Sequence, residues 1–268
     1  MEDVKRKGYL NTDFRIFHLT DHGLGEQGFH YHDFNKILIF LSGNVSYTIE
    51  GRTYALSPYD IVLVPAGAVH HPVVRGEDIY ERIIIYISRE MLESFVENGE
   101  SLSACFHAES PVLRVESLKQ SRLYQCCTEL EKSFSEQDTA FMQLNRKVLF
   151  LEFLIQLNRA VLAHKITYLE TSATHPKLQE ILSYINSHLT EDLSADALSA
   201  AFYLNRSYLM HLFRKETGFS LGEYVSGKRL TAAREMIAGG TPVSEAWENA
   251  GFPSYAAFAR ARAKSRSV

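Results

Sequence analysis

Four side chains in the first third of the chain have the chemistry to hold a small ligand. Imidazole and phenol groups form hydrogen bonds, and imidazole nitrogens also bind transition metals. A hydroxylated molecule such as a sugar suits this mixture, although an aromatic or amphipathic molecule suits it too, and a fully packed interior is the remaining alternative. The residues predicted to line an effector pocket are His30, His32, Tyr47 and His70.

The spacing of the histidines bears on whether this pocket binds a metal ion. It resembles the two motifs of the cupin family, whose enzymes hold a metal with three histidines and a glutamate in a small β-barrel. Here Lys36 occupies the glutamate position, and a cation there repels a metal ion; His71 or Asp33 could substitute as a ligand. We therefore predict no metal and no other cofactor, and keep a cupin-type metalloenzyme as the alternative function. The motif residues are His30, His32, Gly43, Pro65, Gly67 and His70.

Short apolar runs around these residues indicate β-strands. They are rich in β-branched and aromatic residues, and turns such as Ser42-Gly43-Asn44 and Glu50-Gly51 separate them. Strands this short and closely spaced are typical of an antiparallel barrel or a jelly roll. The predicted strands are Lys36 to Leu41, Val45 to Ile49, Arg52 to Leu56, Asp60 to Val64 and Ile83 to Ile87.

The segment from Leu193 to Met236 has the pattern of two short helices joined by a tight turn. Apolar residues recur at helical spacing after Ser194 and again after Asn205, and both are favourable N-cap residues. A plain helical hairpin would explain the apolar positions, but a helix-turn-helix also explains a polar and basic outer face. That face consists of Arg206, Ser207, Met210, His211, Arg214 and Lys215.

The run from Tyr203 to Ile237, YLNRSYLMHLFRKETGFSLGEYVSGKRLTAAREMI, closely resembles the AraC family of bacterial transcription regulators. In that family a long helix joins two helix-turn-helix units, and each unit inserts a recognition helix into the major groove. The resemblance implies a leading helix from Pro176 to Leu189, a recognition helix from Asn205 to Glu216 and a connecting helix from Leu221 to Ala238.

The charge distribution agrees with DNA binding by this part of the chain. The formal net charge is −4 overall, but the segment from Arg206 to Val268 has ten Lys or Arg against five Asp or Glu. A basic segment of this kind supplies affinity for phosphates. We expect Arg206, Arg214 and Lys215 to contact phosphates, and Ser207, Met210 and His211 to read base edges.

A second helix-turn-helix unit is expected after Gly239 and Gly240. An internal repeat at an offset of fifty residues supports it, and the family pattern places the second recognition helix from Ser254 to about Lys264. The repeated residues are Ser194, Ala200, Ala201 and Phe202, which return as Ser244, Ala250, Gly251 and Phe252. The residues expected toward the groove are Tyr255, Ala256, Ala257, Ala259 and Arg260.

This second unit departs from the family pattern. Trp247 stands where a small residue usually packs between helices, and Arg262 stands where a core aromatic usually follows Phe258. Because an unpaired buried charge costs several kcal/mol, Arg262 is expected to point outward. The sequence also lacks the family's Gly-x-x-Pro-x-x-Tyr-Arg ending before Val268. An impaired second unit, dependent on a partner protein or limited to half-sites, is therefore a further alternative.

A helical stretch from Leu118 to about Ala163 separates the two regions. One side carries a predicted packing stripe, and further apolar residues widen the surface beyond one face. Such helices often pair subunits in AraC-type regulators, so we predict a homodimer, with an intramolecular bundle as the alternative. The stripe consists of Leu144, Val148, Leu151, Leu154, Ile155 and Leu162, and the widening residues are Phe150, Phe153, Leu157 and Val161.

Composition restricts the class of protein and its location. A chain of 268 residues suits two domains, and no run approaches the roughly 20 apolar residues of a membrane span. The N-terminal residues lack an apolar signal region, so we predict a cytoplasmic location and no membrane partner. The cysteines have no metal-binding spacing and are expected to stay reduced. They are Cys105, Cys126 and Cys127.

Together these patterns predict an α+β chain of two domains. Residues 1–165 form a cupin-like β-barrel with a helical extension at about 118–164, residues 166–175 form a linker, and residues 176–268 form an all-α domain with two helix-turn-helix units. The predicted function is sequence-specific regulation of transcription under the control of a small-molecule effector, without catalysis. The expected partners are double-stranded DNA, the effector, a second copy of the chain and RNA polymerase.

Overall fold

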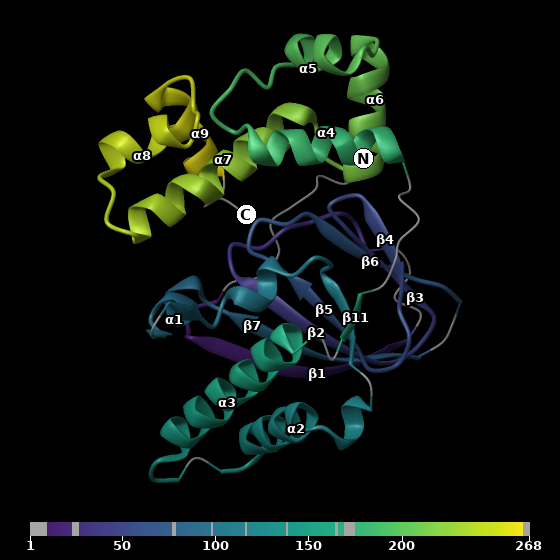
Figure 1. Cartoon of the computed structure of the whole chain (residues 1–268), viewed down its shortest axis with the longest axis vertical. Helices are drawn as coiled ribbons and strands as arrows, with labels where there is room; N and C mark the ends of the chain where they lie inside the picture. Colours follow the sequence, from purple (N-terminus) through teal and green to yellow (C-terminus); the bar gives the residue numbers. More distant parts are fainter. Residues whose placement is uncertain are drawn as a thin grey trace.

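The computed structural model describes residues 10–22, 27–76, 79–97, 99–115, 117–137, 139–163, 166–168 and 175–264. A sheet-rich domain is followed by a helical domain, as Figure 1 shows, so the predicted α+β class with two domains is confirmed. No helix within the described ranges combines the length and the apolar character that crossing a bilayer requires.

Two antiparallel sheets form the N-terminal domain. The larger sheet has the strand order β1-β7-β2-β5-β10-β11, and the smaller has the order β4-β3-β6. All five predicted strands are present, whereas β1, β6, β10 and β11 were not predicted. The strands are β1 (Phe14–His22), β2 (Asn35–Ser42), β3 (Val45–Ile49), β4 (Arg52–Ala55), β5 (Asp60–Val64), β6 (His70–Val74), β7 (Ile79–Ile87), β10 (Val112–Val115) and β11 (Ile166–Tyr168). A short hairpin, β8 (Val96–Glu97) and β9 (Glu100–Ser101), follows helix α1 (Arg89–Glu93).

The large sheet is buried on both faces, which explains its continuous apolar runs. On β2, Ile37 and Ile39 pack toward the helices, whereas Leu38 and Phe40 pack between the two sheets. Strands β5 and β7 divide their side chains in the same way. Because successive side chains of a strand point to opposite faces, both sets must be apolar for the sheet to be covered on each side.

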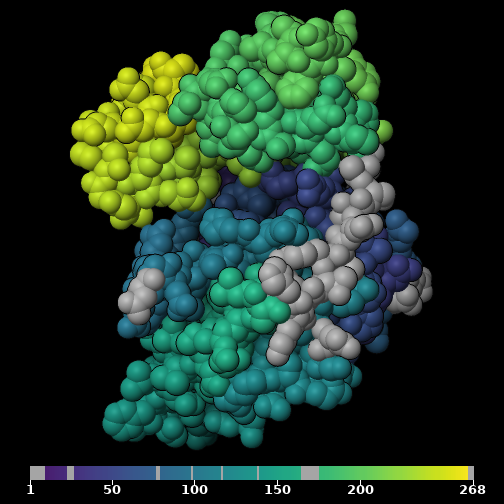
Figure 2. All heavy atoms as spheres, in the orientation of Figure 1, coloured from purple at the N-terminus to yellow at the C-terminus, as the bar shows by residue number. Residues whose placement is uncertain are grey.

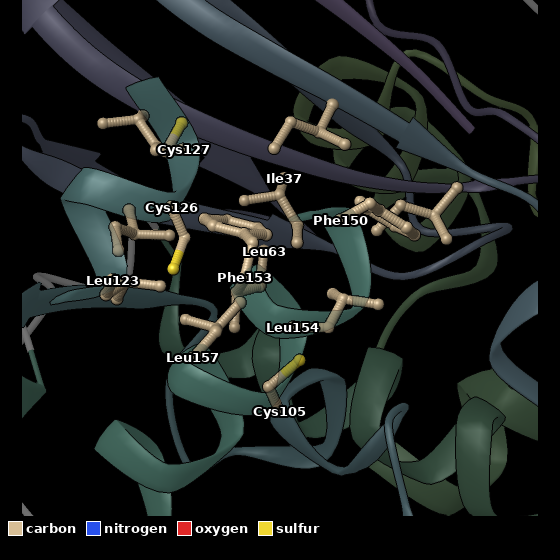
Figure 3. Close-up of a cluster of buried hydrophobic side chains, with 14 of the residues drawn as sticks. Ile37, Leu63, Cys105, Leu123, Cys126, Cys127, Phe150, Phe153, Leu154 and Leu157 are labelled. Carbon is tan, nitrogen blue, oxygen red and sulfur yellow. The ribbon is translucent and has the colours of Figure 1, made fainter. Parts of the chain in front are cut away.

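Helices α2 (Arg122–Ser135) and α3 (Met142–Leu162) cover the outer face of the large sheet, and two short 3₁₀ turns (Ala104–His107 and Leu118–Gln120) precede them. Figure 3 shows their side chains converging with those of the sheet. Cys105, Cys126 and Cys127 are buried in this cluster with free thiols, and burial raises the pKa of each. They are therefore packing residues with unreactive thiols.

The buried face of α3 differs from the prediction. Phe150, Phe153, Leu154, Leu157 and Val161 pack against the sheet. Aromatic side chains bury the most apolar area, which accounts for this choice of face. Most of the predicted packing stripe is instead exposed, and the prediction is wrong there: Leu144 is 59% exposed, Val148 54%, Ile155 44% and Leu162 68%.

The predicted linker begins with ordered chain. Ile166–Tyr168 forms β11, which pairs antiparallel with β10 in the register Leu113 to Tyr168. The prediction of a linker over 166–175 is therefore wrong for its first three residues, since a strand this short carries no visible alternation. Residues 169–174 lie outside the described part of the chain.

The helical domain contains the predicted helices. Ser194 caps α5, Asn205 caps α6, and Ser220 forms a capping box with Glu223 at the start of α7. These local signals explain why α7 has the bounds that the sequence indicated. The helices are α4 (Pro176–Ser187), α5 (Ala195–Phe202), α6 (Arg206–Thr217), α7 (Leu221–Ala238), α8 (Val243–Asn249) and α9 (Tyr255–Lys264).

The loop between α4 and α5 holds the two helix-turn-helix units together. Arg229 of α7 donates hydrogen bonds to the carbonyl oxygens of Leu189 and Glu191, both at 2.7 Å. Gly251, in the turn between α8 and α9, packs against the same loop with φ +88°, and an added Cβ would lie 2.1 Å from the Leu189 oxygen. Only glycine fits this backbone conformation at this distance.

We predict that Gly251→Ala destabilises the second helix-turn-helix unit by about 2 kcal/mol, because the methyl group would meet the Leu189 carbonyl in a strained conformation. The single tryptophan, Trp247, lies in α8, so its fluorescence during urea unfolding reports on this unit. Gly222→Ala in α7 is the control, because the space around Gly222 is open and alanine favours a helix. Equal unfolding midpoints for the Gly251 variant and the native chain would contradict the prediction.

Candidate DNA-binding face and effector site

The predicted DNA contacts of the first unit share the exposed face of α6. The Asn205 side chain accepts hydrogen bonds from the backbone nitrogens of Ser207 and Tyr208, at 2.9 and 3.3 Å, and so fixes the first turn. Buried Leu209 and Phe213 hold the opposite face against the domain core. The six exposed residues are Arg206, Ser207, Met210, His211, Arg214 and Lys215.

This face is hollowed next to its basic side chains. A depression of about 370 Å³ is lined by Met210, His211, Arg214, Lys215 and Ser220. Two of these side chains are cationic, and they belong to the last turn of α6. A concave basic surface beside a protruding helix suits a DNA backbone that follows the edge of the major groove.

Sequence reasoning missed one residue beside this face. Tyr203, in the turn between α5 and α6, has φ 55° and is 95% exposed. The left-handed conformation is unusual for a large side chain and directs the tyrosine into solvent. The only sequence signal was an aromatic residue in a position where turns favour Gly or Asn.

The second unit has a small closed core despite its unusual residues. Trp247 is half-buried against this core and makes an edge-to-face contact with Tyr255 at a centroid distance of 6.4 Å. Arg262 was expected to point outward, and it is partly exposed. Tyr255, Ala256 and Arg260 are exposed, whereas Ala257 and Ala259 are half-buried. The core consists of Leu230, Ala233, Ala250, Phe252 and Phe258.

The four residues of the predicted effector pocket come together inside the N-terminal domain. The His70 ring lies 4.4 Å from that of His30 and 5.0 Å from that of His32, between centroids. The Tyr47 ring lies parallel to His70 at 5.9 Å. All four side chains are buried: His30 is 6% exposed, His32 4%, and Tyr47 and His70 0%. The rings thus pack directly against one another.

Backbone carbonyls orient two of these imidazoles. Nδ1 of His30 lies 2.9 Å from the Gly28 oxygen, and Nδ1 of His70 lies 2.9 Å from the Ala68 oxygen. A carbonyl oxygen only accepts, so each Nδ1 carries a proton. Burial, and then the charge of Lys36, lower the pKa of His70 well below its usual value. His70 is therefore a neutral imidazole.

Three further residues were expected to affect metal binding at this cluster. His71 and Asp33 were possible additional ligands, and Lys36 was expected to repel a cation. The His71 ring contacts the Phe29 ring at a centroid distance of 3.8 Å and a tilt of 51°, and Asp33 pairs with Arg234 at 3.8 Å, so neither joins the cluster. Lys36 is buried and donates to the Tyr47 hydroxyl at 2.9 Å. Burial, together with the charge of Arg82, lowers the pKa of Lys36 to about 7. The expected repulsion is thus weaker than for an ordinary lysine.

Two segments carry the histidine cluster directly beneath the helical domain. We call residues 29–32 and 67–71 the docking segments. His30 and His70 exchange backbone hydrogen bonds at 3.1 and 2.9 Å, and the Gly67 nitrogen donates to the His32 oxygen at 2.7 Å. Phe29 and Val69, which neighbour the histidines in sequence, belong to the apolar core of the helical domain, as does Tyr31. Along the docking segments, side chains that point into the N-terminal domain therefore alternate with side chains that contact the helical domain.

One face of α7 completes the contact between the domains. The Glu50 carboxylate accepts from Lys228 at 2.9 Å, from the Val69 backbone nitrogen at 2.6 Å and from the hydroxyl of Tyr224. Farther along the helix, Thr231 packs against Gly67. Figure 2 shows the green to yellow helical domain resting directly on the sheet domain. Tyr224, Lys228 and Thr231 are spaced by about one helical turn, so a single face of α7 contacts the N-terminal domain.

A cleft opens beside this contact. It has a volume of about 580 Å³, and its lining includes Arg52, Tyr54, Gln179, Asn186 and Lys228. The two domains both contribute to its walls, and its size is that of sites for small organic molecules. No sequence pattern indicated this cleft, because its residues are far apart along the chain.

Comparison with known protein families identifies the family to which this chain belongs. A model of the AraC-like ligand-binding domain matches residues 13–154, and a model of a helix-turn-helix domain matches residues 198–265. The chain belongs to the AraC family. It is an AraC-type DNA-binding transcription regulator with an N-terminal ligand-binding domain, and the resemblance seen in the sequence is confirmed.

Known relatives of this AraC-family chain include transcription activators. The HTH-type transcriptional activators RhaS of Shigella sonnei (strain Ss046) and Escherichia coli (strain K12 / DH10B) are 22% identical over 209 residues, which cover 78% of this chain and 73% of each relative. Among solved structures, ToxT from Vibrio cholerae O395 is 14% identical with a TM-score of 0.37, covering 96% of this chain and 95% of that one. A Listeria innocua protein of unknown function is 29% identical over 35% of this chain and 90% of its own, with a TM-score of 0.33.

We predict that Glu50→Gln weakens the contact between the domains by about 2 kcal/mol, because the charge that Lys228 and Tyr224 share is lost. Burial and the Glu50 charge raise the pKa of Tyr224 well above its usual value, so its hydroxyl remains the donor at neutral pH. Small-angle X-ray scattering should show a larger radius of gyration. Exposed Glu93 provides the control Glu93→Gln, and identical scattering from the two variants would show that Glu50 does not hold the domains together.

Proposed function

We propose that this AraC-family regulator binds double-stranded DNA through the exposed faces of α6 and α9. The observation that carries this proposal is the grouping of five polar or basic side chains, together with Met210, on the solvent face of a capped helix. Ser207, Met210 and His211 read bases, whereas Arg206, Arg214 and Lys215 contact phosphates. In the second unit Tyr255, Ala256, Ala259 and Arg260 occupy the corresponding positions, and the closed core around Trp247 supports an intact second reader.

Control by the effector is proposed to act through the docking segments. His30, His32, Tyr47 and His70 are the proposed effector contacts in a cupin-like N-terminal domain. An effector controls the protein only if it binds one arrangement of the domains better than another. The alternation of residues along the docking segments supports this route, because each histidine is one residue away from a side chain that touches the helical domain.

The protein is proposed to act as a homodimer that pairs through α3. Its exposed apolar stripe faces away from the sheet, and stripes of this kind at helical spacing suit a second helix of the same type. We further propose a cytoplasmic protein without catalytic activity, with an N-terminal domain that extends through β11 to residue 168, a DNA-binding domain of residues 176–268, and RNA polymerase as a partner. The stripe consists of Leu144, Val148, Ile155 and Leu162.

We predict that His211→Ala changes which bases are preferred, because a base contact is lost, whereas Lys215→Ala weakens binding to all duplexes and lowers the salt slope by about one. Selection from random duplexes followed by titration at several salt concentrations measures both effects. Lys132→Ala, on the exposed side of α2, is the control for charge. Unchanged preference and unchanged salt slope would remove α6 as the reading helix.

Footprinting of the protein on its DNA site tests the second helix-turn-helix unit separately. Two working units should protect two groove segments about 34 Å apart. A footprint of one segment, unaffected by Arg260→Ala, would show that α9 does not bind DNA.

We predict that Ile155→Glu converts the dimer to monomers, because the carboxylate would be buried at the α3 interface without a partner. Sedimentation velocity at micromolar concentration measures the change. Ile79→Glu is a closely matched control, since Ile79 on β7 is 45% exposed and Ile155 is 44% exposed. A native chain that sediments as a monomer, or dimers that persist in the Ile155 variant, would overturn pairing through α3.

A further inference from the structure

We propose that Lys36 captures a small aldehyde as an imine on its side-chain nitrogen, with Tyr47 as the proton donor, and that such an aldehyde is the effector of this regulator. The inference rests on the proposed function, because it names the class of effector for a pocket that includes Tyr47. Lys36 lies on β2 of the large sheet and Tyr47 on β3 of the small sheet, and their side chains meet between the two sheets.

Lys36 is a buried amine without an acidic partner. The residue is 6% exposed, and no carboxylate among the described residues pairs with it. Its cross-strand neighbours, Val64 and Tyr86, carry no compensating charge. A buried ammonium without a counter-charge is costly, and burial together with the charge of Arg82 lowers the pKa of Lys36 to about 7. A large share of Lys36 is therefore the neutral, nucleophilic amine at neutral pH.

Tyr47 supplies the acid that addition to a carbonyl group requires. Nζ of Lys36 donates to the Tyr47 hydroxyl at 2.9 Å, so the phenol keeps its own hydrogen, for which the described residues provide no acceptor. Burial raises the pKa of Tyr47 well above its usual value, so this hydrogen stays in place. A nucleophile for the carbonyl carbon and a proton donor for the carbonyl oxygen therefore lie side by side.

The reaction balances within this pair. The lone pair of Nζ attacks the carbonyl carbon, the phenol protonates the carbonyl oxygen, and the amine returns a proton to the phenolate. The carbinolamine then loses its hydroxyl group as water by the same exchange of protons, which leaves a carbon–nitrogen double bond and consumes no oxidant or reductant. The surrounding core is apolar and Tyr47 is 0% exposed, so water that would hydrolyse the imine is kept out.

The cleft between the domains gives an aldehyde a route to the amine. Tyr54 and Ala68 line this cleft of about 580 Å³, and both also belong to the apolar core around Tyr47. Tyr54 pairs directly with Tyr47 across β4 and β3. These two side chains thus border both the cleft and the core that holds the reactive pair. The dense packing of this core admits only a small molecule, and its apolar lining suits an aliphatic aldehyde better than a sugar.

An adduct on Lys36 acts on the DNA-binding domain through β3. A packed core accommodates little added volume, so extra atoms between the sheets displace this strand. Glu50 directly follows β3, and its carboxylate binds Lys228 and Tyr224 of α7. Imine formation therefore loosens the contact that holds α7 against the N-terminal domain.

Capture is tested on the full-length protein with acetaldehyde and sodium cyanoborohydride near pH 7, followed by mass mapping of peptides. Lys36 is about half neutral there, whereas an ordinary exposed lysine is neutral only roughly once in 2,500. We expect an ethyl group to appear on Lys36 at least about 10-fold faster than on Lys119. Lys119 is a matched control within the same chain, because it lies over the Tyr59 ring at 4.3 Å but is exposed. Equal labelling of the two lysines, or an unlabelled Lys36, would overturn the proposal.

Tyr47→Phe separates proton donation from burial of the amine. We expect labelling of Lys36 to slow at least about 10-fold in this variant, because a positioned acid contributes at least this factor, while labelling of Lys119 stays unchanged. Tyr80→Phe is the control, since Tyr80 is buried in the same core and makes no hydrogen bond to Lys36. Unchanged labelling of Lys36 in Tyr47→Phe would remove the proposed pair.

Hydrogen exchange of the labelled protein tests the link to α7. We expect faster exchange over residues 221–231 after labelling and no change in α2. Lys36→Met cannot form the adduct, so aldehyde should leave its exchange unaltered. An ethylated Lys36 with unchanged exchange in α7 would overturn the role of the aldehyde as effector.

These measurements use no DNA, so they separate this inference from the proposed function. A chain that selects specific duplexes but is not labelled at Lys36 remains a DNA-binding regulator with another effector. A chain that is labelled at Lys36 but selects no duplex keeps the aldehyde site and loses the proposed function.

Discussion

The alternation of side chains along the two docking segments constrains both domains of this protein. In extended chain, neighbouring residues face opposite sides, so the segments that place histidines in the interior must also present residues to the helical domain. His30 and His70 are buried inside the N-terminal domain. Their neighbours in sequence, Phe29, Tyr31 and Val69, pack instead in the apolar core of the helical domain. Because the same backbone carries both sets of side chains, a backbone shift at the histidines also displaces the outer surface.

Local signals made the helical domain largely predictable. Ser194, Asn205 and Ser220 each accept a hydrogen bond from the first turn of a helix, and such caps depend on residues only two or three positions apart. The strands with long apolar runs were predictable for a similar reason. The convergence of His30, His32 and His70 was inferred from motif spacing, and the structure brings these residues together with Tyr47.

The features that escaped prediction depend on contacts between distant residues. Glu50 reads as an ordinary turn residue, yet its carboxylate meets Lys228 and Tyr224, more than 170 positions away. Two apolar faces of α3 were both compatible with burial, and only packing against the sheet decides for the face with Phe150 and Phe153. Periodicity describes one element at a time and cannot say which neighbour an element will meet.

Helix α7 has a consequence for the kind of control that is available. It joins the two helix-turn-helix units and also contacts the ligand-binding domain along one face, through Tyr224, Lys228 and Thr231. Its 18 residues span about 27 Å of continuous helix. The two readers of one chain are therefore carried as a single rigid unit. In the proposed homodimer, a signal from the other domain would turn this unit relative to the second copy and so change which pairs of sites the two copies span, while the spacing read by each chain stays constant.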